Sequence, residues 1–132
     1  LYRRRKNRIE VKLMNFRTKR LGGDMQQIIA DIIEHRIKDP RKTQMVAVTK
    51  VDVAKDLKTA KVYLDVLGDE QSAASTFATV VRSAGFIKSE LAKEFRDIRH
   101  IPDLHFIRDE SARYSEKIEK ILQDIKHNGS DN

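Results

Sequence analysis

The 132-residue chain has no cysteine and no tryptophan, and it contains only two prolines and five glycines. The absence of cysteine excludes a disulfide framework and any thiolate metal site. Its apolar runs, such as Met45–Val48, are far too short to span a bilayer. We therefore expect a cytoplasmic protein that binds no metal, no cofactor and no membrane.

The sequence also lacks the motifs of common catalytic sites. Its four histidines form no HExxH pattern, and there is neither a nucleophile elbow nor a phosphate-binding glycine loop. Five phenylalanines and three tyrosines, mostly on apolar stripes, cannot supply the aromatic platform of an RRM. We predict that the protein is not an enzyme and has no catalytic residues, and that it would recognise RNA through shape and backbone.

The net charge of +7 is unevenly distributed. Residues 1–13 carry six cations and one anion, so most of the excess positive charge lies there, and Met14 is the first methionine. We expect residues 1–15 to be a basic leader, either disordered or a non-native extension; the alternative is a basic arm that binds RNA. Any argument for nucleic-acid binding must therefore rest on the position of cations in the folded part.

Hydrophobic spacing predicts the secondary structure of that folded part. A helix is expected over 21–37, although the pair Gly22-Gly23 weakens its first turn, and strands are expected over 45–53 and 60–67. A short polar segment joins the two strands, which indicates an antiparallel hairpin, and a change of parity predicts a bulge near Thr49-Lys50. A third strand is expected over 104–107, and Ser111 is expected to cap a last helix.

Between the second and third strands, two amphipathic helical patterns meet at Ser83-Ala84-Gly85. A glycine in a helix interior costs about 1 kcal/mol relative to alanine, so we predict a bend there. The predicted buried stripes comprise Ala74, Phe77, Val81 and Ala84 before the bend, and Ile87, Leu91, Phe95 and Ile98 after it. The whole order is typical of an α+β domain with one small three-stranded sheet.

Cations cluster beside the predicted bend. On a helical wheel, Lys88, Lys93, Arg96 and Arg99 fall within an arc of about 140° beside the apolar stripe, as a phosphate-binding face requires. A solvated helix with ion pairs is the alternative reading. The predicted RNA-binding residues are the bend with its cations (Arg82, Ser83, Ala84, Gly85, Lys88, Lys93, Arg96, Arg99), followed by Arg17, Lys19, Arg20, Lys42, Lys50, Lys55 and Lys58.

Taken in order, several segments resemble bacterial ribosome-binding factor A. These are Asn15-Phe16-Arg17, Lys38-Asp39-Pro40-Arg41, AKVYLDVLGD (60–69), RSAGFIKSELAKEF (82–95) and IPDLHFIRDES (101–111). The resemblance implies a KH-like fold of type II topology, in which a helix-kink-helix with an Ala-x-Gly pattern replaces the Gly-x-x-Gly loop. Ser83-Ala84-Gly85 occupies that motif, with serine where the family pattern has alanine.

The resemblance also implies a function. Members of the family are cold-shock-associated assembly factors that bind the free small ribosomal subunit and its rRNA and assist late maturation and rRNA processing. We expect residues 16–110 to form the KH-like domain, 111–127 a C-terminal helix and 128–132 a disordered tail, in a monomer. The alternatives are a protein-interaction module that docks on a ribosomal protein and a generic KH-type nucleic-acid binder.

Overall fold

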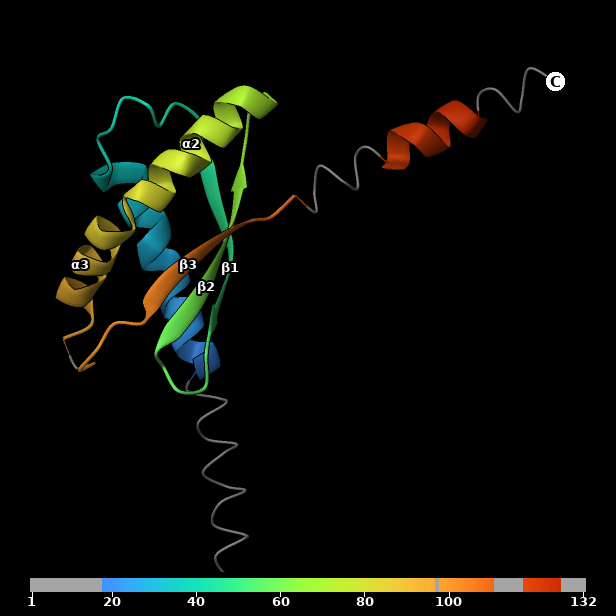
Figure 1. Ribbon diagram of the computed structural model, residues 1–132. Coiled ribbons are helices and arrows are strands. Elements are labelled where there is room, and N and C mark those ends of the chain that lie inside the picture. The colour runs from blue at the N-terminus through green and yellow to red at the C-terminus, as the bar shows by residue number, and fades with distance from the viewer. Residues whose placement is uncertain (1–17, 97, 111–117, 127–132) are drawn as a thin grey trace, which may run out of the picture.

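The computed structural model describes residues 18–96, 98–110 and 118–126 (Figure 1). A helix over 18–31 continues into a π-helical turn, η1 (Ile32–Arg36). The elements that follow are β1 (Val46–Val53), β2 (Thr59–Val66), α2 (Glu70–Arg82), α3 (Ala84–Glu94) and β3 (Asp103–Arg108), and a further helix spans 118–126. The α+β class is as predicted. Within the described residues, no helix is both long and apolar enough to cross a membrane.

The three strands form one sheet in the order β1-β2-β3. β1 and β2 are antiparallel, and their register shifts between Val48 and Lys50, which confirms the predicted bulge. β2 and β3 are parallel, with Thr59 opposite Asp103. Because a parallel neighbour needs a long crossover, the chain passes through α2 and α3 before it returns to the sheet.

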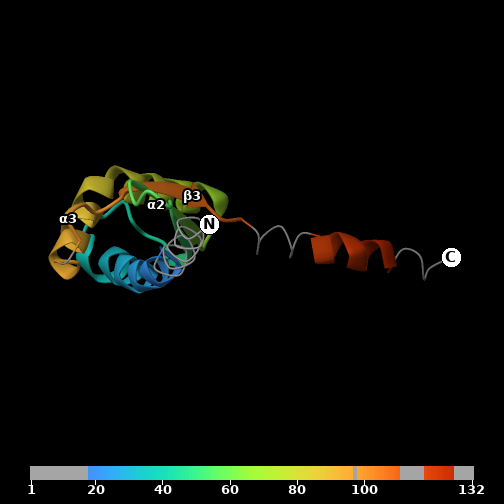
Figure 2. The same ribbon diagram turned by 90° about the horizontal axis from the view of Figure 1, so that it is seen from below.

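The hydrophobic core lies between the helices and one face of the sheet. Alternate residues of β2, from Ala60 to Val66, are buried. Helix 18–31 and its π-helical turn contribute Met25, Ile29, Ile32 and Ile33, and α3 contributes Ile87 and Leu91. Seen from below, helix 18–31, α3 and β3 surround the same interior (Figure 2).

Helix 18–31 also packs along β1, at the edge of the sheet. The Gln26 side-chain amide donates a hydrogen bond to the Val48 carbonyl over 2.9 Å. A β-carbon placed on Gly22 would lie 2.6 Å from the Val51 carbonyl oxygen, far inside van der Waals contact. The sequence suggested only that Gly22 weakens the first turn of the helix. In the structure, this glycine also allows the helix to approach the strand closely.

The buried face of α2 differs from the predicted stripe. The structure buries Ala73, Thr76, Thr79 and Val80 instead, while Ala74 and Val81 are exposed. Two threonines can occupy this face because their hydroxyl groups have partners. The Thr76 hydroxyl accepts from the backbone N–H groups of Thr43 and Gln44, and the Thr79 hydroxyl donates to the Ser75 carbonyl.

The expected C-terminal helix, 111–127, lies only partly within the described residues. Residues 118–126 are helical and exposed, whereas 111–117 and 127 lie outside the described residues. The predicted leader, 1–15, and the predicted tail, 128–132, also lie outside the described residues. The helix is drawn in red in Figure 1.

Candidate functional site

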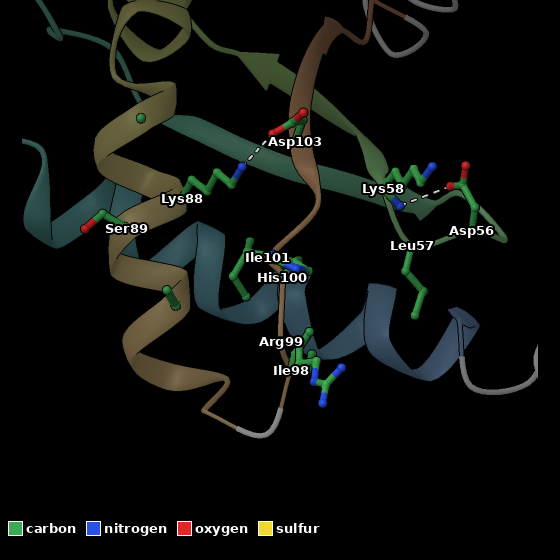
Figure 3. Close-up of a pocket in the computed structure, with 12 residues that line it drawn as sticks. Asp56, Leu57, Lys58, Lys88, Ser89, Ile98, Arg99, His100, Ile101 and Asp103 are labelled. Atoms are coloured by element: carbon green, nitrogen blue, oxygen red, sulfur yellow. Dashed lines mark hydrogen bonds and ion pairs between the residues drawn. The ribbon is translucent and has the colours of Figure 1, made fainter.

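A groove of about 890 Å³ lies between α3, the turn that joins β1 to β2, and the segment that leads into β3 (Figure 3). Because β2 and β3 are parallel, the start of both strands and the β1–β2 turn meet at the same end of the sheet. The groove is lined by Asp56, Leu57, Lys58, Gly85, Lys88, Ser89, Ala92, Ile98, Arg99, His100, Ile101 and Asp103. Sequence reasoning did not identify His100 or Leu57, since neither carries a local signal of function.

Small residues form the α3 side of the groove. Gly85, Ser89 and Ala92 are spaced at one helical turn, so they share a face of α3. The backbone at Gly85 has no positive φ, and a β-carbon built there would meet nothing within 4 Å. The fold therefore accepts alanine at position 85, and the glycine keeps this wall open to the close approach of a partner.

Three cations line the same groove. The Lys88 amine lies 2.5 Å from a carboxylate oxygen of Asp103, and this hydrogen bond lowers the pKa of Asp103 (Figure 3). The side chains of Lys58 and Arg99 form no hydrogen bond or ion pair with another described residue. Lys58 and Arg99, which no described residue holds, are thus available to an anionic partner. The Lys88 amine must first break its contact with the Asp103 carboxylate, or contact this carboxylate and the partner at the same time.

Leu57, in the turn beside the groove, has an unusual conformation. Its φ is +62°, and no other non-glycine residue in the described part of the chain has a positive φ. A left-handed conformation costs a side-chain-bearing residue about 1–2 kcal/mol. The side chain is nevertheless 40% exposed, so burial offsets only part of this cost.

The predicted bend is confirmed at Ser83. This residue, with φ −87° and ψ 8°, ends α2 and precedes α3. Its hydroxyl donates back to the Thr79 carbonyl over 2.9 Å, and it gives α3 no side-chain cap. The Ser83 hydroxyl therefore serves a backbone carbonyl in the last turn of α2. The first turn of α3, at Ala84 and Gly85, begins without a capping side chain.

The predicted arc of four cations on one helix is wrong. α3 ends at Glu94, because Phe95 takes non-helical angles and the chain turns toward β3, so Arg96 and Arg99 lie beyond the helix. Arg99 reaches the groove, but Arg96 is exposed outside it. The helical wheel assumed that the helix continues through residue 99. The helix ends earlier because the chain turns back to form β3.

Lys93 belongs to an ion-pair cluster that joins α3 to the end of the first helix. Its amine lies 3.0 Å from Glu90, and Arg36 contacts Glu90 at 2.9 Å and Glu94 at 3.2 Å. Hydrogen bonds from Lys93 and Arg36 lower the pKa of Glu90. Arg36 also contacts Asp31 at 3.1 Å. We conclude that Lys93 has a structural partner within the protein.

Three other predicted cations also have internal partners. The Lys42 amine donates to the Ile33 carbonyl at the end of the first helix. The Lys50 amine lies 5.9 Å from the centre of the Tyr63 ring, and Arg82 donates to the Thr79 hydroxyl over 3.2 Å. The last group of predicted residues lies elsewhere: Lys19 and Arg20 are exposed on helix 18–31, Lys55 is exposed on the β1–β2 turn, and Arg17 lies outside the described residues.

No group of three or more metal-binding side chains comes together within the part of the chain that the structure describes. The groove combines three cations with the carboxylates of Asp56 and Asp103, small residues and a few apolar side chains. Such a surface suits a phosphate-bearing polymer, because cations contact phosphates while small residues allow its backbone to come close.

Comparisons with known proteins identify relatives of this chain. A family model described as ribosome-binding factor A matches residues 17–122. Ribosome-binding factor A of Staphylococcus epidermidis is 43% identical over 114 residues, which are 86% of this chain and 97% of that protein. The match thus extends over the described fold and nearly the whole relative.

Two structural comparisons agree with this result. The crystal structure of ribosome-binding factor A from Thermus thermophilus has a TM-score of 0.60 and 23% identity, covering 69% of this chain and 93% of that one. A homology model of the Thermus thermophilus factor, fitted into a cryo-EM map of its 30S complex, has a TM-score of 0.57 and 24% identity, covering 70% and 96%. These similarities confirm the predicted KH-like fold.

Proposed function

Since this chain belongs to the ribosome-binding factor A family, we propose that it binds the free small ribosomal subunit in the cytoplasm and contacts its rRNA. On this proposal it assists late maturation and rRNA processing, in association with cold shock, by binding and without catalysis. The name of the family and the 30S complex of the Thermus thermophilus factor support the choice of partner.

One observation carries the assignment of the contact surface. Lys58 and Arg99, which are 41 positions apart in the sequence, line one groove, opposite the open wall at Gly85, and neither side chain has a partner among the described residues. Five of the other predicted cations contact neighbouring groups, and Lys19, Arg20, Lys55 and Arg96 are exposed but lie outside the groove. We therefore assign the rRNA backbone contact to this groove.

The proposed mechanism is selective binding. A ligand shifts a conformational equilibrium only through its different affinities for the two states. The factor must therefore bind an rRNA conformation of the immature subunit more tightly than the conformation in the mature subunit. Completion of maturation then removes the preferred conformation, and release follows.

The experiment compares three proteins in sedimentation binding to purified immature and mature small subunits. We expect the double variant Lys58→Ala/Arg99→Ala to bind immature subunits at least about tenfold more weakly than the wild type, since hydrogen bonds to charged groups contribute about 1.5–3 kcal/mol each. Lys38→Ala, which removes one positive charge outside the groove, is the control and should bind like the wild type. Equal affinity of the wild type for both kinds of subunit would contradict the mechanism.

A second assay separates rRNA contact from docking on a ribosomal protein. The wild type should bind protein-free rRNA fragments of the small subunit, and the double variant should bind them less tightly. A protein-interaction module would ignore the fragments. A generic nucleic-acid binder would bind unrelated RNA of the same length equally well.

A further inference from the structure

The open face of the sheet carries an exposed apolar pair at the end opposite the groove. Met45 and Leu67 are 69% and 49% exposed, and the Leu67 N–H donates to the Met45 carbonyl over 3.0 Å. This bond continues the β1–β2 ladder beyond the pair Val46 and Val66, of which Val46 packs against the core and Val66 is buried. Since side chains alternate along a strand, Met45 and Leu67 lie together on the opposite, open face.

Helix 118–126 is the second apolar surface that has no partner among the described residues. Its apolar residues are spaced as one stripe and are 37–62% exposed: Ile118, Ile121, Leu122 and Ile125. All nine residues of the helix are exposed. A helix this short is marginal in water by itself, and such a stripe normally packs against another surface.

The path of the chain brings these two surfaces into reach of each other. After β3, the Asp109 N–H donates to the Leu64 carbonyl over 2.7 Å, three residues before Leu67. The Asp109 carboxylate accepts from the Thr49 hydroxyl over 2.8 Å, so the chain leaves the sheet beside β1 and β2, at the end that carries Met45. Eight residues separate Asp109 from Ile118, and they can span up to about 30 Å at 3.3–3.6 Å per residue.

We propose that helix 118–126 folds back and packs its apolar stripe on Met45 and Leu67. The helix then covers one end of the open face. The groove, at the start of β2, stays accessible.

Another exposed apolar pair, Val81 and Phe86, lies at the bend between α2 and α3. It is a poorer site for the helix because the chain does not leave the domain there. The exit lies beside the start of α2, where Arg108 pairs with Glu70, and Val81 is 11 residues further along this helix, or about 17 Å at 1.5 Å per residue. The Val81 site therefore serves as the comparison in the test.

The absence of cysteine from the chain allows a clean cross-linking test on the full-length protein. We compare mild air oxidation of Leu67→Cys/Leu122→Cys with that of Val81→Cys/Leu122→Cys and of Leu67→Cys/Asp124→Cys, which places the thiol on the polar side of the helix. The first variant should form an intramolecular disulfide at least about tenfold faster than either control, because docking raises the effective concentration of the two thiols. Equal rates would overturn the proposal, and so would a disulfide between two chains, which would indicate a second copy as the partner.

Amide hydrogen exchange gives an independent measurement. Docking should slow exchange across 118–126 in the wild type at least about tenfold relative to Met45→Glu/Leu67→Glu, because the docked helix must open before its amides exchange. Both substituted side chains are exposed, so the thermal midpoint of the domain should change little. Equal exchange across 118–126 in the two proteins would show that the helix does not use this pair.

Discussion

Gly22 faces the Val51 carbonyl oxygen so closely that a β-carbon at position 22 would lie 2.6 Å from it. The contact joins the first helix to the edge of the sheet, and the obstacle is backbone, which cannot rotate away as a side chain could. We expect Gly22→Ala to lower the free energy of unfolding by about 1–3 kcal/mol, the usual cost of overpacking. Urea denaturation of the variant and the wild type measures this difference, and an unchanged midpoint would contradict it.

Gly85 should behave in the opposite way. Its backbone is helical and its missing side chain would meet nothing, so Gly85→Ala should raise the free energy of unfolding by up to about 1 kcal/mol. The same methyl group would narrow the groove, so binding to immature small subunits should weaken. A variant that is more stable but binds less tightly would separate the role of this glycine in function from its role in the fold. Undiminished binding would remove Gly85 from the interface.

The salt dependence of binding tests the groove cation Arg99 separately from the fold. Replacing Arg99 by Ala should make the slope of log K against log salt shallower by about 0.7–0.9, the value for one lost phosphate contact. Arg41→Ala is the matched control, since Arg41 lies outside the groove and contacts Asp39 at 2.7 Å. If both variants keep the wild-type slope, the interface does not include Arg99.

Acid should destabilise the fold through its paired carboxylates. Hydrogen bonds from Arg41 lower the pKa of Asp39 to about 2, and those from Lys93 and Arg36 lower the pKa of Glu90. Because these folded-state values lie below the unfolded values of about 3.9 and 4.3, the stabilisation is present above pH 4–5 and is lost as pH falls toward 2.

We expect the urea midpoint to fall between pH 5 and pH 2, and less steeply in Glu90→Gln than in the wild type. Glu119→Gln is the control, since Glu119 is exposed on helix 118–126, away from the Glu90 cluster. An identical pH dependence in Glu90→Gln and the wild type would show that the Glu90 cluster does not contribute to acid stability.

Local patterns in the sequence predicted the elements well. Alternating valines indicated β1 and β2, and the change of parity located the bulge that the register shift confirms. Ser83-Ala84-Gly85 located the break between α2 and α3. These features depend on residues within a few positions of one another, so periodicity and turn chemistry are sufficient to reveal them.

Local patterns gave wrong predictions where contacts between residues distant in the sequence determine the structure. The wheel placed Lys88, Lys93, Arg96 and Arg99 on one face, but α3 stops at Glu94 because the chain must return to pair with β2. The stripe predicted for α2 missed Thr76, whose burial depends on backbone donors more than 30 positions away.

The sequence alone determined the order of elements, the family resemblance and the position of the bend, since each depends on residues that are close together in the sequence. The tertiary structure alone decided which cations remain available. Arg36 meets Glu90 across 54 positions and Lys88 meets Asp103 across 15, whereas Lys58 and Arg99 converge on one groove without a described partner. An ion pair depends on distance in space, and the folded chain sets that distance.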